Sequence, residues 1–157
     1  MPTTIKEGDS APPFDLENDR GERVKLDDLK GKWVVLYWYP KDDTPGCTTE
    51  ACEIRDNWGL ISGDAELFGI SPDNVASHQK FRDKFSLPFP LLADPEHTVS
   101  DAYGVWGPKT FAGHEYMGVD RATFIIGPDG KVARVFPKVT PAGHALEIMQ
   151  ALKELKA

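Results

Sequence analysis

Residues 33–52, WVVLYWYPKDDTPGCTTEAC, contain the two patterns that decide the fold. The segment Trp33–Tyr39 is continuously apolar, rich in β-branched and aromatic residues, and is followed directly by a proline. Such a segment predicts a buried central strand. Thr44 is a favoured N-cap residue and Pro45 suits the first position of a helix. We therefore predict a strand, a short polar loop, and a helix from Pro45 to about Leu60.

The remaining pattern alternates strands and helices. A tight-turn sequence, Gly127-Pro128-Asp129-Gly130, separates two strand-like segments and predicts a hairpin. The predicted strands are Glu66–Ile70, Leu91–Ala93, Arg121–Ile126 and Lys131–Phe136, and the predicted helices run from the turn at 71–74 to Phe85, from His97 to Tyr103, and from about Pro141 to Leu155. This order predicts an α/β fold with a mixed central sheet flanked by helices, and a single domain over residues 1–157.

Composition excludes several function classes. The chain has 157 residues and a net charge of -7, with no Lys/Arg cluster, so a nucleic-acid partner is not expected. The longest apolar run is too short to span a membrane, and Met1–Phe14 lacks the apolar core of a signal peptide, so a cytoplasmic protein without membrane contact is expected. The four histidines are scattered without the spacing of a metal site, so no metal is expected.

The only two cysteines are Cys47 and Cys52. Cys47 falls in the first turn of the predicted helix, where free N–H groups and the helix dipole favour a thiolate. On an intact helix the two Cα atoms would be roughly 8 to 9 Å apart. A disulfide tolerates at most about 7 Å, so the thiols can pair only after local unwinding. An activated thiol is favoured, while inert core cysteines, metal ligands and a thioredoxin-type dithiol remain alternatives.

The pattern Pro40-x-x-x-Thr44-x-x-Cys47 resembles the active-site signature of peroxiredoxins, thiol peroxidases with a thioredoxin-like fold. With Cys52 five residues after Cys47, the chain resembles the Q-type subgroup, also called bacterioferritin comigratory proteins. The resemblance extends over residues 69–73, 87–94, 103–107 and 121–126. It implies a thioredoxin-like fold for nearly the whole chain.

The resemblance also implies a role for each residue of the site. Cys47 would be the peroxidatic nucleophile and Cys52 the resolving cysteine, which forms an intramolecular disulfide with it. Arg121 would hold the thiolate and stabilise the leaving oxygen, Thr44 would offer its hydroxyl to thiolate and peroxide, and Pro40 would shield the sulfenic acid. The implied substrates are hydrogen peroxide and organic hydroperoxides. The implied reductant is thioredoxin or a similar dithiol protein, and the implied enzyme is a monomer without a cofactor.

Two other functions remain open for the same cysteine pair. One is protein thiol-disulfide exchange, against which the five-residue offset argues. The other is a peroxide-sensing redox relay. The neighbouring acidic residues receive no catalytic role at this point: Asp42 and Asp43 are interpreted as a solvated loop face, and Glu50 as a solvated helix residue.

Overall fold

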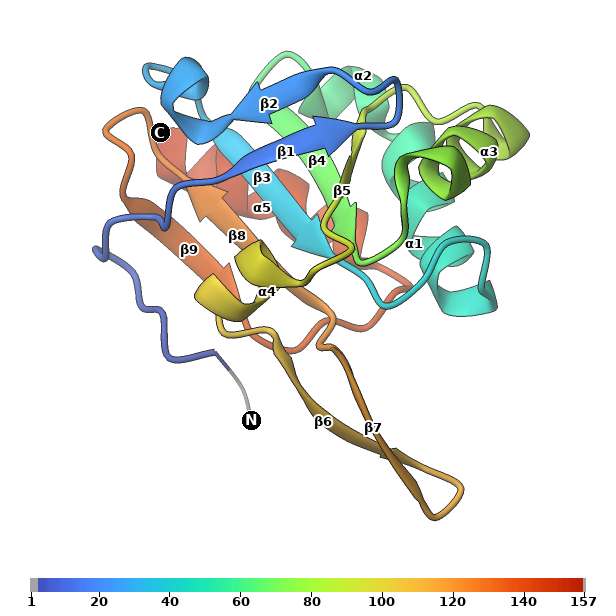
Figure 1. The fold of residues 1–157 in the computed structure, drawn as a ribbon. Coiled ribbons are helices and arrows are strands. Elements are labelled where there is room, and N and C mark those ends of the chain that lie inside the picture. The colour runs from blue at the N-terminus through green and yellow to red at the C-terminus, as the bar shows by residue number, and fades with distance from the viewer. Residues whose placement is uncertain (1–2, 157) are drawn as a thin grey trace.

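The computed structural model describes residues 3–156, so the outermost residues of the expected domain, 1, 2 and 157, lie outside the described residues. Its main sheet has seven strands in the order β2-β1-β5-β4-β3-β8-β9 (Figure 1). The strands are β1 (Asp15–Asn18), β2 (Arg23–Lys25), β3 (Val34–Trp38), β4 (Glu66–Ser71), β5 (Leu91–Ala93), β8 (Ala122–Ile126) and β9 (Val132–Phe136). The central strands β3, β4 and β5 are parallel, whereas the outer pairings are antiparallel. The predicted mixed sheet is confirmed.

Helices cover the sheet, and a separate hairpin projects from it (Figure 1). The helices are η1 (Leu26–Leu29), α1 (Pro45–Asp56), α2 (Trp58–Ile61), α3 (Val75–Phe85), α4 (Thr98–Ala102) and α5 (His144–Lys156), and the projecting hairpin is β6 (Trp106–Phe111) with β7 (His114–Val119). In the part of the chain that the structure describes, no helix has the length and apolar character needed to cross a membrane.

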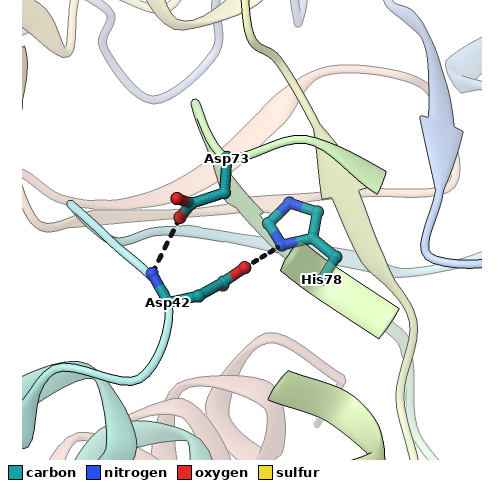
Figure 2. Close-up of side chains that lie close together, drawn as sticks. All are labelled: Asp42, Asp73 and His78. Atoms are coloured by element: carbon teal, nitrogen blue, oxygen red, sulfur yellow. Dashed lines mark hydrogen bonds and ion pairs between the residues drawn. The ribbon is translucent and has the colours of Figure 1, made fainter. Parts of the chain in front are cut away.

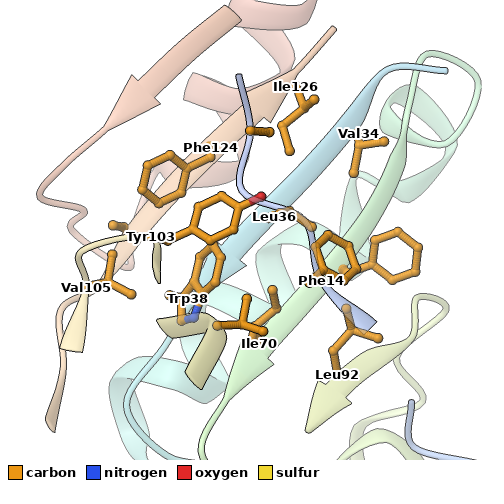
Figure 3. Close-up of a cluster of buried hydrophobic side chains, with 14 of the residues drawn as sticks. Phe14, Val34, Leu36, Trp38, Ile70, Leu92, Tyr103, Val105, Phe124 and Ile126 are labelled. Atoms are coloured by element: carbon orange, nitrogen blue, oxygen red, sulfur yellow. The ribbon is translucent and has the colours of Figure 1, made fainter. Parts of the chain in front are cut away.

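The central strand β3 explains why the molecule has a core on each face of the sheet. Alternate residues of a strand point to opposite faces. Leu36 and Trp38 enter one core, with the N-terminal segment and α4, whereas Val35 and Tyr37 enter the other, with α1, α2, α3 and α5. Figure 3 shows the first core, in which Trp38 lies among aromatic and aliphatic side chains. Because both faces are covered, β3 is apolar throughout, as predicted.

Several boundaries differ from the prediction. The helix expected from Pro45 to Leu60 is divided at Asn57, which ends α1 before the short helix α2 begins. The last helix begins at His144 instead of Pro141. The strands β1 and β2 at one side of the sheet and the hairpin β6–β7 were not predicted. Their residues are mostly exposed or half-buried, so their sequences lack the apolar periodicity that marks the central strands.

Candidate active site

Cys47 lies where the loop after β3 enters α1. It is the third residue of the helix and is 1% exposed. Thr44 is the N-cap residue with an extended backbone, and Pro45 begins the helix, as predicted. The Thr44 hydroxyl donates to the carbonyl oxygen of Lys41 at 3.0 Å and does not cap the helix. The thiol therefore lies at the end of α1 that carries the positive helix dipole, where an anion is stabilised.

Arg121 reaches this thiol from the neighbouring strand. In the sheet, Ala122 of β8 is paired with Trp38 of β3, which places Arg121 beside the carboxyl end of β3. Its Nη2 donates to Cys47 Sγ at 3.3 Å. Its Nη1 donates to Glu50 Oε1 at 2.7 Å. One guanidinium thus joins two residues of α1 that are one turn apart, and it supplies a cation beside the sulfur.

Glu50 is buried, which corrects the interpretation of this residue as solvated. Cys47, Glu50 and Ala51 all face the core, because residues three and four apart share one side of a helix. Burial raises the pKa of Glu50 to about 7, and the neighbouring Arg121 opposes this rise. Among the described residues, Glu50 Oε2 and the Tyr37 hydroxyl have no hydrogen-bond partner.

The charge state of the other groups follows from the same environment. Burial alone would lower the pKa of Arg121, but the Cys47 and Glu50 side chains beside it outweigh that effect and raise it. The guanidinium is therefore always charged. Burial, followed by the nearby Glu50, raises the pKa of Tyr37 well above its ordinary value, so its hydroxyl remains neutral. Beside the sulfur thus lie a fixed cation, Arg121, and, one helical turn along α1, a titratable carboxyl group, Glu50.

The remaining predicted site residues do not belong to the cluster of Cys47, Arg121 and Glu50. Cys52 is half-buried in the same unbroken helix as Cys47, and both thiols are free. This arrangement agrees with the expectation that the pair needs local unwinding to react. Pro40 lies two residues after the end of β3 and is exposed. The structure therefore brings together Cys47, Arg121 and Glu50, whereas Pro40 and Thr44 form the loop that leads to them.

Comparison with known proteins agrees with this site. The model of the AhpC/TSA family matches residues 7–135 of the chain. This chain belongs to the AhpC/TSA family. Peroxiredoxin Bcp of Bacillus subtilis (strain 168) is 48% identical over 153 residues, which cover 97% of this chain and 98% of that protein. Peroxiredoxin Bcp of Escherichia coli (strain K12) is 42% identical over 151 residues, covering 96% and 97%.

Solved structures give the same result. A structure of the Xanthomonas campestris bacterioferritin comigratory protein, described together with the alkyl peroxide reduction activity of that protein, superposes with a TM-score of 0.89 at 32% identity, covering 99% of each chain. The resemblance to Q-type peroxiredoxins and the thioredoxin-like fold are thereby confirmed. The protein is a peroxiredoxin, an enzyme of the thiol peroxidase class.

A second buried polar group in this peroxiredoxin corrects another interpretation. Asp42 is not part of a solvated loop face, since it is 7% exposed and accepts hydrogen bonds from the Tyr39 and Ser77 hydroxyls. Figure 2 shows its further hydrogen bond to His78. Asp43, in contrast, is exposed and forms a surface ion pair with Lys84. Nothing in the sequence near Asp42 distinguishes it from Asp43, because its partners on α3 lie more than 30 residues away.

Proposed function

We propose that this peroxiredoxin reduces hydrogen peroxide and organic hydroperoxides with Cys47 as the peroxidatic residue. The observation that carries the proposal is the single guanidinium of Arg121, which contacts both Cys47 Sγ and the buried Glu50 at a helix N-terminus. A preorganised cation of this kind stabilises negative charge both on the thiolate and on an oxygen that leaves next to it.

The first chemical step is nucleophilic attack on the peroxide. The Cys47 thiolate attacks one oxygen of the O–O bond, so an S–O bond forms while the O–O bond breaks. Cys47 becomes a sulfenic acid, and the second oxygen leaves as hydroxide or alkoxide and takes up a proton. Arg121 stabilises the charge that develops on the leaving oxygen. The Thr44 hydroxyl donates to the peroxide once it has left the carbonyl oxygen of Lys41. Pro40 limits the access of water to the sulfenic acid.

The second step closes a disulfide within the chain. The Cys52 thiolate attacks the sulfenic sulfur of Cys47, so an S–S bond forms and water leaves. Because both cysteines lie on α1, the helix between them unwinds first. The disulfide is then reduced by thioredoxin or a similar dithiol protein. No second subunit contributes to these steps, so we propose a monomer that acts as one domain in the cytoplasm, where such reductants keep thiols reduced.

Single-turnover kinetics test these assignments. Fully reduced protein is mixed with one equivalent of hydrogen peroxide, and thiol loss is followed together with tryptophan fluorescence. We expect both thiols to disappear far faster than free cysteine does, with the mass change of one disulfide. Cys47→Ser should abolish peroxide reduction. Cys52→Ser should keep the first turnover but lose recycling by thioredoxin.

The same experiment separates the alternatives. A reaction no faster than that of free cysteine would favour protein thiol-disulfide exchange, in which protein disulfides are the better substrates. Normal thioredoxin-linked turnover of Cys52→Ser would exclude Cys52 as the resolving residue. Retained peroxidase activity of Cys47→Ser would exclude the whole assignment.

A further inference from the structure

The mechanism uses none of the buried polar residues centred on Asp42. Asp42 Oδ1 accepts from the Tyr39 hydroxyl at 2.6 Å. Asp42 Oδ2 accepts from the Ser77 hydroxyl at 2.8 Å and lies 2.7 Å from His78 Nδ1. The Asp42 side chain is 4% exposed and that of His78 is 0% exposed. We call these four residues, together with Asp73, the Asp42 network, of which Figure 2 shows Asp42, Asp73 and His78.

The geometry fixes the protons of the Asp42–His78 pair. His78 Nε2 lies 2.9 Å from the carbonyl oxygen of Leu92, which can only accept, so Nε2 carries a hydrogen. His78 Nδ1 faces Asp42 Oδ2, an oxygen that already accepts from Ser77. A proton must therefore lie between Nδ1 and Oδ2. The contact is a hydrogen bond that shares one proton between an imidazole and a carboxyl group inside the protein, where a polar group is costly to leave unpaired.

The Asp42 network joins three segments at the entrance of α1. The Asp42 backbone N–H donates to Asp73 Oδ2 at 2.7 Å, which attaches the loop to the segment between β4 and α3. His78 attaches it to α3 and, through Leu92, to β5. Between Asp42 and Cys47, the described structure has one further side-chain bond to another element, the exposed pair of Asp43 and Lys84. Asp42 is therefore the last buried attachment before the peroxidatic helix.

A metal ion is the competing use of this cluster, since ligand atoms of Asp42, Asp73 and His78 lie within 4.8 Å of one another. Each of these atoms already has a protein partner. Both oxygens of Asp42 and both ring nitrogens of His78 are engaged, and Asp73 Oδ2 accepts from the Asp42 N–H and from the Ser71 hydroxyl. A cation would have to replace this complete set of bonds, so the cluster is better suited to holding the loop in place.

We propose that Asp42 is a positioning residue of this peroxiredoxin, which through His78 fixes the start of α1 and thereby sets the balance between two reactions of Cys47. This inference rests on the proposed function, because Cys47 must meet peroxide in the folded helix and Cys52 in the unwound one. With Asp42 attached, Cys47 is kept beside Arg121 and unwinding is restricted to the residues after the loop. Without that attachment, the folded arrangement that attacks peroxide is populated less.

Stopped-flow fluorescence of two matched variants tests this proposal. Asp42→Asn keeps the shape of the side chain but replaces one carboxyl oxygen by an NH2 group, which donates and cannot accept, so the full set of bonds to Tyr39, Ser77 and His78 is not retained. Asp43→Asn makes the same substitution at the adjacent, exposed position, where Asn tolerates the left-handed backbone (φ 58°). The peroxide-dependent phase reports the attack by Cys47, and the peroxide-independent phase reports disulfide closure. Trp58, in α2 directly after α1, is a suitable reporter.

For Asp42→Asn we expect the peroxide-dependent rate constant to fall by roughly 5- to 150-fold, the range implied by leaving one buried hydrogen-bonding group unpaired. The rate constant of disulfide closure should stay unchanged or rise, so less Cys47 is over-oxidised to sulfinic acid at high peroxide, as measured by mass spectrometry. Asp43→Asn should match the wild type in both phases. A purely structural role would not change the two phases in opposite directions.

Ser77→Ala provides a milder test should Asp42→Asn fold poorly, because it removes one hydrogen bond from the same carboxyl group and leaves Asp42 and His78 in place. As in Asp42→Asn, the peroxide-dependent rate constant should fall and that of disulfide closure should stay unchanged or rise, but by smaller factors. The proposal is overturned if Asp42→Asn and Ser77→Ala both stay within twofold of Asp43→Asn, or if both phases slow in equal proportion. If the wild type forms no Cys47–Cys52 disulfide at all, the proposed function fails first, and this inference fails with it.

Discussion

The buried carboxyl group of Glu50 gives the protein a pH-dependent stability that one substitution should remove. Burial raises the pKa of Glu50 from 4.5 to about 7, although Arg121 donates to its Oε1 at 2.7 Å. Glu50→Gln retains an oxygen that can accept from Arg121 and the same side-chain length, but it cannot ionise. The two proteins therefore differ mainly in the free energy needed to ionise a buried carboxyl group one helical turn after Cys47.

The sign and size of the effect follow from linkage. The folded protein holds the Glu50 proton more tightly than the unfolded chain, so the resulting stabilisation is complete below pH about 4.5 and is lost as the pH rises to about 7. At about 1.36 kcal/mol per pKa unit, the rise corresponds to roughly 3 kcal/mol. Relative to the wild type, Glu50→Gln should therefore gain roughly that free energy of unfolding between pH 4.5 and pH 8.

Urea unfolding at a series of pH values measures this difference. We would compare proteins with and without the Glu50→Gln substitution, both in a Cys47→Ser background, so that ionisation of the neighbouring thiol does not enter. Titratable groups common to both proteins cancel in the difference, which isolates position 50. Glu53→Gln, on the same helix and half-buried, is the matched control; Glu53 makes only the smallest contribution to the raised pKa of Glu50, so this variant should keep most of the pH dependence of the wild type.

A difference in unfolding free energy that stays constant from pH 4.5 to pH 8 would refute the reasoning. It would mean that Glu50 has the same proton affinity in the folded and unfolded states. A difference that grows with falling pH would be equally contradictory, since it would mean that Arg121 outweighs burial and keeps the carboxylate ionised.

Three further substitutions test the packing beside the site and within the two cores. Gly46→Ala would place a Cβ 3.3 Å from Arg121 Nη2, so we expect the peroxide rate constant to fall roughly 3- to 10-fold, while urea unfolding changes little. Gly69→Ala would place a Cβ 2.8 Å from the Tyr37 ring, and this overpacking should cost about 1–3 kcal/mol in the same unfolding assay. Phe124→Ala empties a fully buried position on the other face of the sheet and should cost about 3–5 kcal/mol. A change of less than about 0.5 kcal/mol in either core variant would contradict the packing described, as would an unchanged peroxide rate for Gly46→Ala.

Strands and helices could be predicted from the sequence wherever neighbouring residues along the chain determine them. Trp33–Tyr39 is apolar at every position because β3 is covered on both faces, and this continuous pattern is visible without a structure. The start of α1 was equally predictable, since Thr44 and Pro45 fit the first helical positions by their own backbone preferences. These two elements place Cys47 in the first turn of a helix.

Burial and long-range pairing, in contrast, were decided by the tertiary structure. Glu50 and Asp42 are charged residues, which are rarely buried without a partner, and each has a partner distant in sequence: Arg121, 71 residues away, and His78, 36 residues away. No local pattern marks such pairs. Strands β1 and β2 and the β6–β7 hairpin were not predicted for a related reason, because their half-exposed residues have no apolar period.

The sequence by itself thus determined the order of strands and helices, the position of the two thiols and, through its motif, the resemblance to peroxiredoxins. The tertiary structure alone decided which carboxyl groups are withdrawn from water and which of them Arg121 contacts, although the motif had already implied Arg121 as the cation beside the sulfur. The physical reason is that helix caps and strand patterns depend on near neighbours along the chain. The surroundings of Cys47 and Asp42, in contrast, depend on Arg121 before strand β8 and on His78 of helix α3, which only folding brings to the start of α1.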